Sequence, residues 1–344
     1  MKGGNKMRQD RNVFTINNLL IFAFSITVSI STVYSQTEVT GFFDLLSSQN
    51  INTNTSHEFS INQFELDVTY AHQSNFSVGT AVAYNSELEN MELAMAFVHY
   101  SFDDGPALHP RREETYDHSA FLIGKFDMPF GLDYLSFAST DRPTISQPLV
   151  IEKTIGGWND VGIDFHMFKG NFKFDVWAVN GFADGVGLGG NIRYTLFPFM
   201  ELGASHSSDI TSFDEVEDWI NGVDLQINTN MFQFKSEYLW MEGVYEGELD
   251  VPGIDDQHHG VYFQLLTEFE DLISLPLYLT LRYGGWGSDF DRDQDGTNDC
   301  QNRYTAALGY RLHDNLSLRL EMLSNQVAKL DRENQVFLQA VVAF

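Results

Sequence analysis

Apolar and polar residues alternate along most of this chain with a period of two. In FELDVTY (residues 64–70) and LSLRLEM (residues 316–322), every second residue is apolar and the residues between are polar. This period is typical of β-strands with one apolar and one polar face. About sixteen such runs occur, beginning near residues 37, 57, 75, 91, 119, 160, 172, 187, 200, 218, 231, 259, 276, 303, 316 and 334.

The connections between these runs fall into two length classes. Short turns are expected at 72–75, 169–171, 197–199, 228–230 and 313–315, and long polar loops at 46–57, 126–160, 181–189, 207–217, 242–258, 285–302 and 324–333. Loop 85–90 is shorter than this alternation expects, and segment 103–118 is longer. The pattern predicts a sheet with short turns on one rim and long loops on the other.

The chain ends on a strand-like run, VFLQAVVAF (residues 336–344). In a closed barrel the last strand pairs with the first, so we expect Phe344 to lie in the sheet, on the apolar face, next to residues 39–44. Outer-membrane barrels have alternating strands of about ten residues, short periplasmic turns and longer outer loops. The prediction is an all-β fold: an antiparallel transmembrane β-barrel of about sixteen strands. The alternative is a secreted sandwich or propeller, whose turns would not be sorted by length.

The first 35 residues have the features of a secretory signal peptide. Four basic residues precede the apolar run LLIFAFSITVSI (residues 19–30), and small residues follow it. The run is shorter than the roughly 20 residues that a membrane-spanning helix needs. We therefore expect cleavage after Ser35 and a mature barrel over residues 36–344. Together with the strand pattern, this predicts the outer membrane of a Gram-negative bacterium.

Charge and cysteine content narrow the classes of partner. The chain has 48 acidic and 20 basic residues, a net charge of −28, which argues against nucleic-acid binding. Loops 207–218, 242–259 and 285–302 hold sixteen acidic residues and one base, Arg292. Such loops favour cations at a channel mouth, or they serve only to keep the outer surface soluble. With one cysteine, Cys300, no internal disulfide is expected.

The middle of the chain resembles a known porin family. MELAMAFVHYSF (91–102), FLIGKFDMPFG (121–131) and WAVNGFADG (177–185) follow one another as in the phosphate-selective porins. This resemblance implies a sixteen-stranded barrel with one loop folded inward to narrow the pore. The sequence lacks the many lysines and arginines that the phosphate-binding members need along the lumen.

Loop 126–160 is the candidate constriction because it is the longest connection, and long ordered loops are usually functional. The alternative is a flap outside the barrel. The residues predicted to line the pore at this loop are Lys125, Asp127, Arg142, Glu152, Lys153 and Asp160. By strand parity, further inward charges are Glu65, Asp67, Asp164, Asp175, Glu237, Glu268 and Glu321, with Lys173, Lys235, Arg282, Arg311 and Arg319.

The run DFDRDQDGTND (289–299) resembles calcium-binding loops. Asp291, Asp293, Asp295 and Asp299 offer the oxygen ligands that calcium prefers, and Gly296 allows the sharp turn. Asn302 stands where such loops carry an acidic residue. Calcium binding and a solvated acidic loop are both compatible with the run, and no other cofactor is expected.

Motifs for catalysis are absent from the sequence pattern, so we do not expect an enzyme. His166, His206 and His313 stand apart from one another in the sequence. Two functions remain: a porin that lets small hydrophilic solutes or ions diffuse through the outer membrane, and a surface scaffold whose acidic loops bind divalent cations or a partner. The expected surroundings are outer-membrane lipid and, for a porin, two further copies in a homotrimer.

Overall fold

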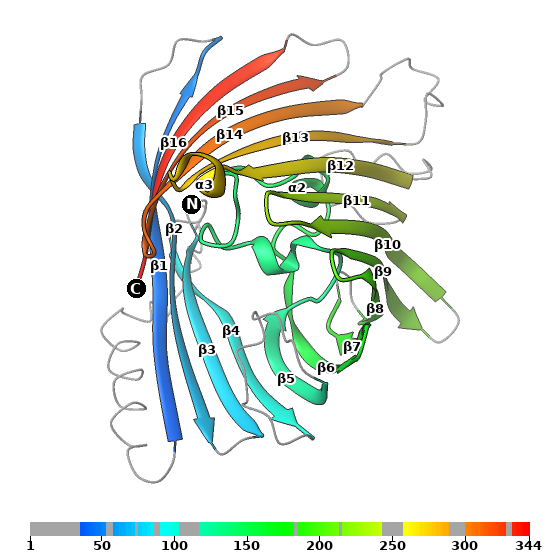
Figure 1. The fold of residues 1–344 in the computed structure, drawn as a ribbon. Helices are drawn as coiled ribbons and strands as arrows, with labels where there is room; N and C mark the ends of the chain where they lie inside the picture. The colour runs from blue at the N-terminus through cyan, green and yellow to red at the C-terminus, as the bar shows by residue number, and fades with distance from the viewer. Residues whose placement is uncertain are drawn as a thin grey trace, which may run out of the picture.

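The structure is a computed structural model that describes residues 35–52, 58–72, 75–85, 90–102, 117–181, 185–212, 215–242, 257–288, 300–327 and 332–344. Sixteen strands form one closed antiparallel barrel in which each strand pairs with the next and the last pairs with the first (Figure 1). The strands are β1 (Ser35–Asn50), β2 (Glu58–His72), β3 (Phe76–Asn85), β4 (Asn90–Ser101), β5 (His118–Asp127), β6 (Asn159–Lys169), β7 (Phe172–Val179), β8 (Val186–Phe197), β9 (Met200–Ser212), β10 (Glu215–Asn228), β11 (Phe232–Glu242), β12 (Gln257–Glu268), β13 (Leu277–Ser288), β14 (Gln301–His313), β15 (Leu316–Val327) and β16 (Glu333–Ala343). The sixteen-stranded barrel predicted from the sequence is confirmed.

The two faces of each strand meet different surroundings. On β15, Leu320 and Met322 are about half exposed on the outer wall, whereas Arg319 and Glu321 are buried on the inner wall. An apolar outer wall around a polar interior matches a barrel whose outside contacts hydrocarbon. Closure of the sheet also gives every strand two hydrogen-bonded neighbours, which lipid requires because it cannot satisfy free backbone groups. Among the described residues, no helix is long and apolar enough to cross a bilayer.

The end of the chain closes the barrel. Phe344 and Gly41 exchange both backbone hydrogen bonds, at 2.9 and 3.0 Å. Phe344 is half exposed on the outer wall together with Leu338, while Gln339 is fully buried on the inner face. The predicted pairing of the terminal strand with β1, and its parity, are therefore confirmed.

The rims agree with the predicted alternation, with one correction. The segment 207–217 was expected to be a loop, but β9 continues to Ser212 and β10 begins at Glu215. Asp209 and Asp218 are buried inside the barrel, so these acids do not belong to the outer surface. The prediction was wrong because polar residues that face a lumen look like loop residues in sequence. The unexpectedly long segment 103–118 lies mostly outside the described residues, as do residues 1–34.

Three short helical elements lie between strands in the described part of the chain. A 3-10 helix (Asp133–Ser136) and α2 (Leu149–Lys153) belong to the connection from β5 to β6. The helix α3 (Glu270–Ile273) lies in the connection from β12 to β13, on the short-turn rim. The β5–β6 connection is the one that enters the barrel, and it forms the candidate site.

Candidate functional site

Residues 128–158, called the inner segment below, run inside the barrel between β5 and β6. Figure 1 shows α2 and the rest of this connection within the ring of strands. Met128 and Phe130 are at most 1% exposed, and so are Val150 and Ile151 of α2. Burying such side chains stabilises the inward fold by about 1.5–3 kcal/mol each relative to a fully exposed position. The apolar residues of this connection therefore explain why it folds inward.

The first docking point of the inner segment is a turn at Gly131. Its backbone N–H donates to Ser205 Oγ at 3.0 Å, and its carbonyl accepts from Arg193 at 3.0 Å. Arg193 is itself held by Asp224, 2.7 Å away. Gly131 has a φ of +70°, and a Cβ at this position would overlap the carboxylate of Glu237. Only glycine fits this turn, which rests against β8 to β11.

The second docking point is Ser139, on the opposite side of the barrel. Its backbone N–H donates to Gln63 Oε1 at 2.9 Å, and its hydroxyl donates to Asp44. Its carbonyl accepts from Arg319. Gln339 donates to the same carboxylate of Asp44. The inner segment is thus tied to β1, β2, β15 and β16, so it crosses the lumen from the first docking point to the second.

The third docking point surrounds Ser146. The carboxylate of Glu321, fully buried, accepts from the backbone N–H of Ile145 at 2.7 Å and of Ser146 at 3.1 Å. Arg282 donates to Thr144 Oγ1 at 2.9 Å and to Ser146 Oγ at 2.6 Å. These contacts join the returning half of the inner segment to β13 and β15.

Arginines of the wall and of the inner segment gather near this third point. Arg303 of β14 forms an ion pair with Glu152 of α2. Arg142 is 7% exposed and its Nε has no hydrogen-bond partner among the described residues. Arg142 belongs to the inner segment and not to a spanning strand. Burial and the neighbouring Arg319 and Arg282 lower its pKa to about 10. It stays positively charged at neutral pH, so the lumen holds a cation that no described carboxylate contacts directly.

Of the six predicted pore residues, the structure brings Arg142 and Glu152 into the lumen, where Glu152 pairs with a wall arginine. Lys153 ends α2 and is half-buried. Asp127 is the last residue of β5, and Asp160 is the second residue of β6, so each lies at a strand end next to the inner segment. Lys125 does not join this group, because it has the outward parity of Ile123 and its ammonium donates to the carbonyl of Leu93 at 2.9 Å.

The four aspartates of the predicted calcium loop lie in residues 289–299, outside the described part of the chain. Calcium binding by Asp291, Asp293, Asp295 and Asp299 therefore stays a prediction. Several wall charges that hold the inner segment were not singled out from the sequence, namely Asp44, Arg193, Asp224 and Arg303. Strand alternation could have placed them on the inner face, since each has the parity of its inward neighbours.

The remaining wall facing the inner segment is largely apolar. A buried cluster joins the inner segment to β3–β5, β7 and β10–β13. Trp158 meets Phe130 and, edge to face, Trp177 of β7. The wall members of this cluster include Met95, Phe97, Leu122, Val179, Ile220, Leu239, Tyr262 and Trp286. The inner segment is therefore held by apolar packing as well as by the charged contacts at Gly131, Ser139 and Ser146.

Comparison with known proteins supports the fold and leaves the family open. No family model and no curated protein sequence matches the chain. The outer-membrane channel DcaP of Acinetobacter baumannii has a similar structure, with a TM-score of 0.65 and 13% identity over 91% of this chain and 99% of DcaP. OmpF of Salmonella typhi, in complex with daunomycin, gives a TM-score of 0.64 and 12% identity over 91% of this chain and 99% of OmpF. The trimer form of OmpT of Vibrio cholerae gives a TM-score of 0.63 and 11% identity over 91% of this chain and 100% of OmpT.

At these identities the similarity concerns the fold alone. The closed outer-membrane β-barrel fold predicted from the sequence is confirmed at that level. The narrower resemblance to the phosphate-selective porins has no family match behind it, and it stays a prediction.

Proposed function

We propose that this chain is an outer-membrane porin of a Gram-negative bacterium, through which small hydrophilic solutes or ions diffuse passively. The observation that carries the proposal is the inner segment, which crosses the lumen and is tied to the wall at Gly131, Ser139 and Ser146. A segment held at this depth sets the narrowest cross-section of the barrel. Selectivity then follows from its width and from the charges around it.

Conductance in a planar lipid bilayer tests the proposal. Purified, folded protein should insert as discrete channels, and liposomes that contain it should swell in small sugars and not in larger ones. Folded protein that inserts and gives neither conductance nor swelling would exclude a porin. Reversal potentials in asymmetric salt then test the phosphate-selective alternative, which requires strong anion preference.

The second candidate function is a surface scaffold. It is favoured by the buried cluster of Trp158, Trp177 and their neighbours, which fills part of the lumen. A barrel closed by this packing would conduct nothing, while its acidic outer loops would still bind divalent cations or a partner. Absence of channels combined with saturable calcium binding would support this function over the first.

We also propose a homotrimer, since trimeric assembly is described for one structural neighbour, the OmpT trimer form. Sedimentation of the detergent-solubilised protein, or its migration on native gels before and after heating, measures the assembly directly. A monomer under conditions that keep the barrel folded would contradict the proposal.

A further inference from the structure

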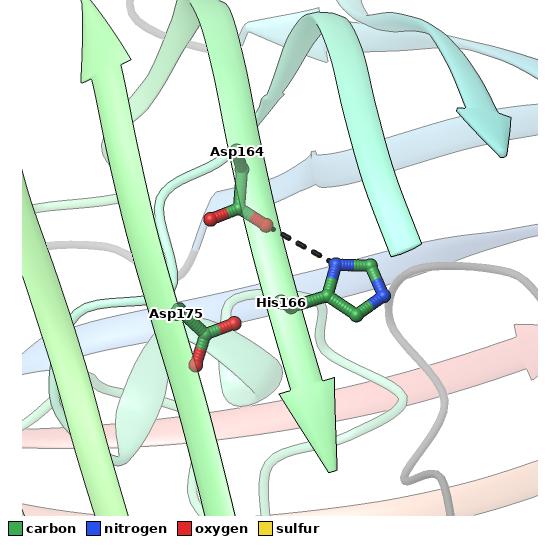
Figure 2. Close-up of side chains that lie close together, drawn as sticks. All are labelled: Asp164, His166 and Asp175. Atoms are coloured by element: carbon green, nitrogen blue, oxygen red, sulfur yellow. Dashed lines mark hydrogen bonds and ion pairs between the residues drawn. The ribbon is translucent and has the colours of Figure 1, made fainter. Parts of the chain in front are cut away.

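Histidines and aspartates converge on the inner wall of strands β4 to β7, near the short-turn rim. His166 of β6 lies opposite Asp175 of β7 in the strand register. Its Nδ1 is 3.2 Å from Asp164 Oδ2 (Figure 2), and its Nε2 is 3.3 Å from Nε2 of His99 on β4. His118 of β5 also meets the ring of His166, edge to face. The sequence had left His166 isolated, because these residues come together only through the pairing of four strands.

Three of these side chains have the arrangement of a metal-ligand set. One ligand atom each from Asp164, His166 and Asp175 lies within 4.8 Å of the other two. A tetrahedral zinc ion with ligands at about 2.0–2.2 Å holds their atoms roughly 3.3–3.5 Å apart. Asp164 and His166 already meet that separation at 3.2 Å, so closure needs the carboxylate of Asp175 to move by at most roughly 1.5 Å. In Figure 2, a carboxylate oxygen of Asp175 points toward the space between the other two side chains.

The hydrogen bonds around this set fit ligation by Nδ1 of His166. Asp164 is 2% exposed, and its Oδ1 has no hydrogen-bond partner among the described residues. A buried carboxylate with a free oxygen is costly unless a cation or a donor meets it. If Nδ1 of His166 binds a metal, its proton lies on Nε2, which then donates to Nε2 of His99. Metal-bound histidines commonly donate their second ring nitrogen in this way.

We propose that Asp164, His166 and Asp175 bind a divalent transition-metal ion of the zinc class at the periplasmic end of the lumen, with His99 orienting the ring of His166. One imidazole with two carboxylates suits zinc and its neighbours better than calcium or magnesium, which prefer oxygen ligands only. His166 and Asp175 are partly exposed, so an ion can enter from the lumen, and water completes the coordination. The site is independent of whether the barrel conducts, because it needs only the folded wall.

Titration calorimetry with Zn²⁺ tests the site. The full, folded chain in detergent is first stripped with a chelator, and Mg²⁺ and Ca²⁺ are titrated for comparison. We expect saturable binding of one zinc per chain that neither Mg²⁺ nor Ca²⁺ displaces at equal concentration. Zinc retained after dialysis, measured by atomic emission, gives the stoichiometry independently.

Variants separate this site from the acidic outer loops. Asp175→Asn and His166→Gln should remove the binding, and His99→Ala should weaken it about 10–100-fold through loss of the orienting hydrogen bond. His206→Gln is the matched control, since His206 is exposed on the outer wall beside Asn221 and should leave affinity unchanged. Heat-dependent gel mobility checks that each barrel is folded. If the His166→Gln barrel does not fold, the binding measured for Asp175→Asn decides the test.

Two results would overturn the proposal. One is the absence of saturable zinc binding by the wild-type chain. The other is equal binding by the wild type and by folded Asp175→Asn. Absence of conductance in the bilayer experiment would exclude the proposed porin function but would not affect the proposed zinc site. The two proposals therefore fail separately.

Discussion

The sharpest test of the inner segment is Glu321→Ala. The Glu321 carboxylate is fully buried and accepts the backbone N–H groups of Ile145 and Ser146 at 2.7 and 3.1 Å. Its removal leaves two amide donors without their acceptor, at a cost of about 1–3 kcal/mol each, or roughly 2–6 kcal/mol in all. Removal also takes away a negative charge that offsets the mutual repulsion of Arg282 and Arg142. We expect the stretch around Ile145 and Ser146 to leave its place while α2 and the barrel itself remain folded.

Single-channel recording in planar bilayers measures the effect. Glu321→Ala should increase both the conductance and its noise relative to wild type, and liposomes should admit larger sugars. Glu321→Gln keeps an acceptor oxygen and should lie between the two. Glu268→Gln, which breaks a partly exposed ion pair with Arg311 on the short-turn rim, is the control and should leave conductance unchanged. Wild-type conductance and sugar cut-off in Glu321→Ala would refute the assignment of these contacts as the hold on the segment.

Three further predictions concern the turn, the closure of the barrel and the charge of its mouth. Gly131→Ala places a Cβ against Glu237 at a φ of +70° and should open the channel. Gly170→Ala is the control: its φ is +60° and a Cβ there would have nothing within 4 Å, so it meets only the backbone strain of about 1–2 kcal/mol and should not alter conductance. Deleting Phe344 removes its backbone pairing with Gly41 and an aromatic side chain worth at most about 1.5–3 kcal/mol, so a large fall in outer-membrane levels would point to recognition by the assembly machinery, and normal levels would exclude that role. Reversal potentials should show mild cation preference at low salt that fades above about 0.1 M, where the screening length is ~10 Å, and strong anion preference would contradict this.

The barrel could be predicted from the sequence because its signal is local. Alternation with period two, as in LSLRLEM, needs only neighbouring residues, and a lipid-facing wall keeps the apolar half of the pattern regular. The wrong prediction of a loop at residues 207–217 also follows from this reliance on local alternation. There, Ser207 and Asp209 face the lumen, and Ser208 between them is polar too, so the alternation loses contrast although the strand continues.

The site was predicted less completely because its contacts join residues far apart in the chain. The contact between Arg282 and Thr144 spans 138 residues, and that between Ser139 and Arg319 spans 180. Parity placed Arg282, Arg319 and Glu321 on the inner face but could not say what they touch. Parity should also have excluded Lys125, which lies at an outward position directly before the inward Phe126.

The inner segment is held by two kinds of contact, and they respond differently to mutation. Phe130, Trp158 and α2 bury apolar surface against β7 and β10–β13, and no single charge change removes that burial. Ser139 and Ser146 are held by hydrogen bonds to Asp44 and Glu321, whose loss acts at one point. Charge variants should therefore shift the stretch from Ser139 to Ser146, while Phe130, α2 and Trp158 stay in place. A graded change in conductance, without loss of the folded barrel, is what this division of contacts requires. A scaffold closed by the apolar cluster would instead remain closed in every one of these charge variants.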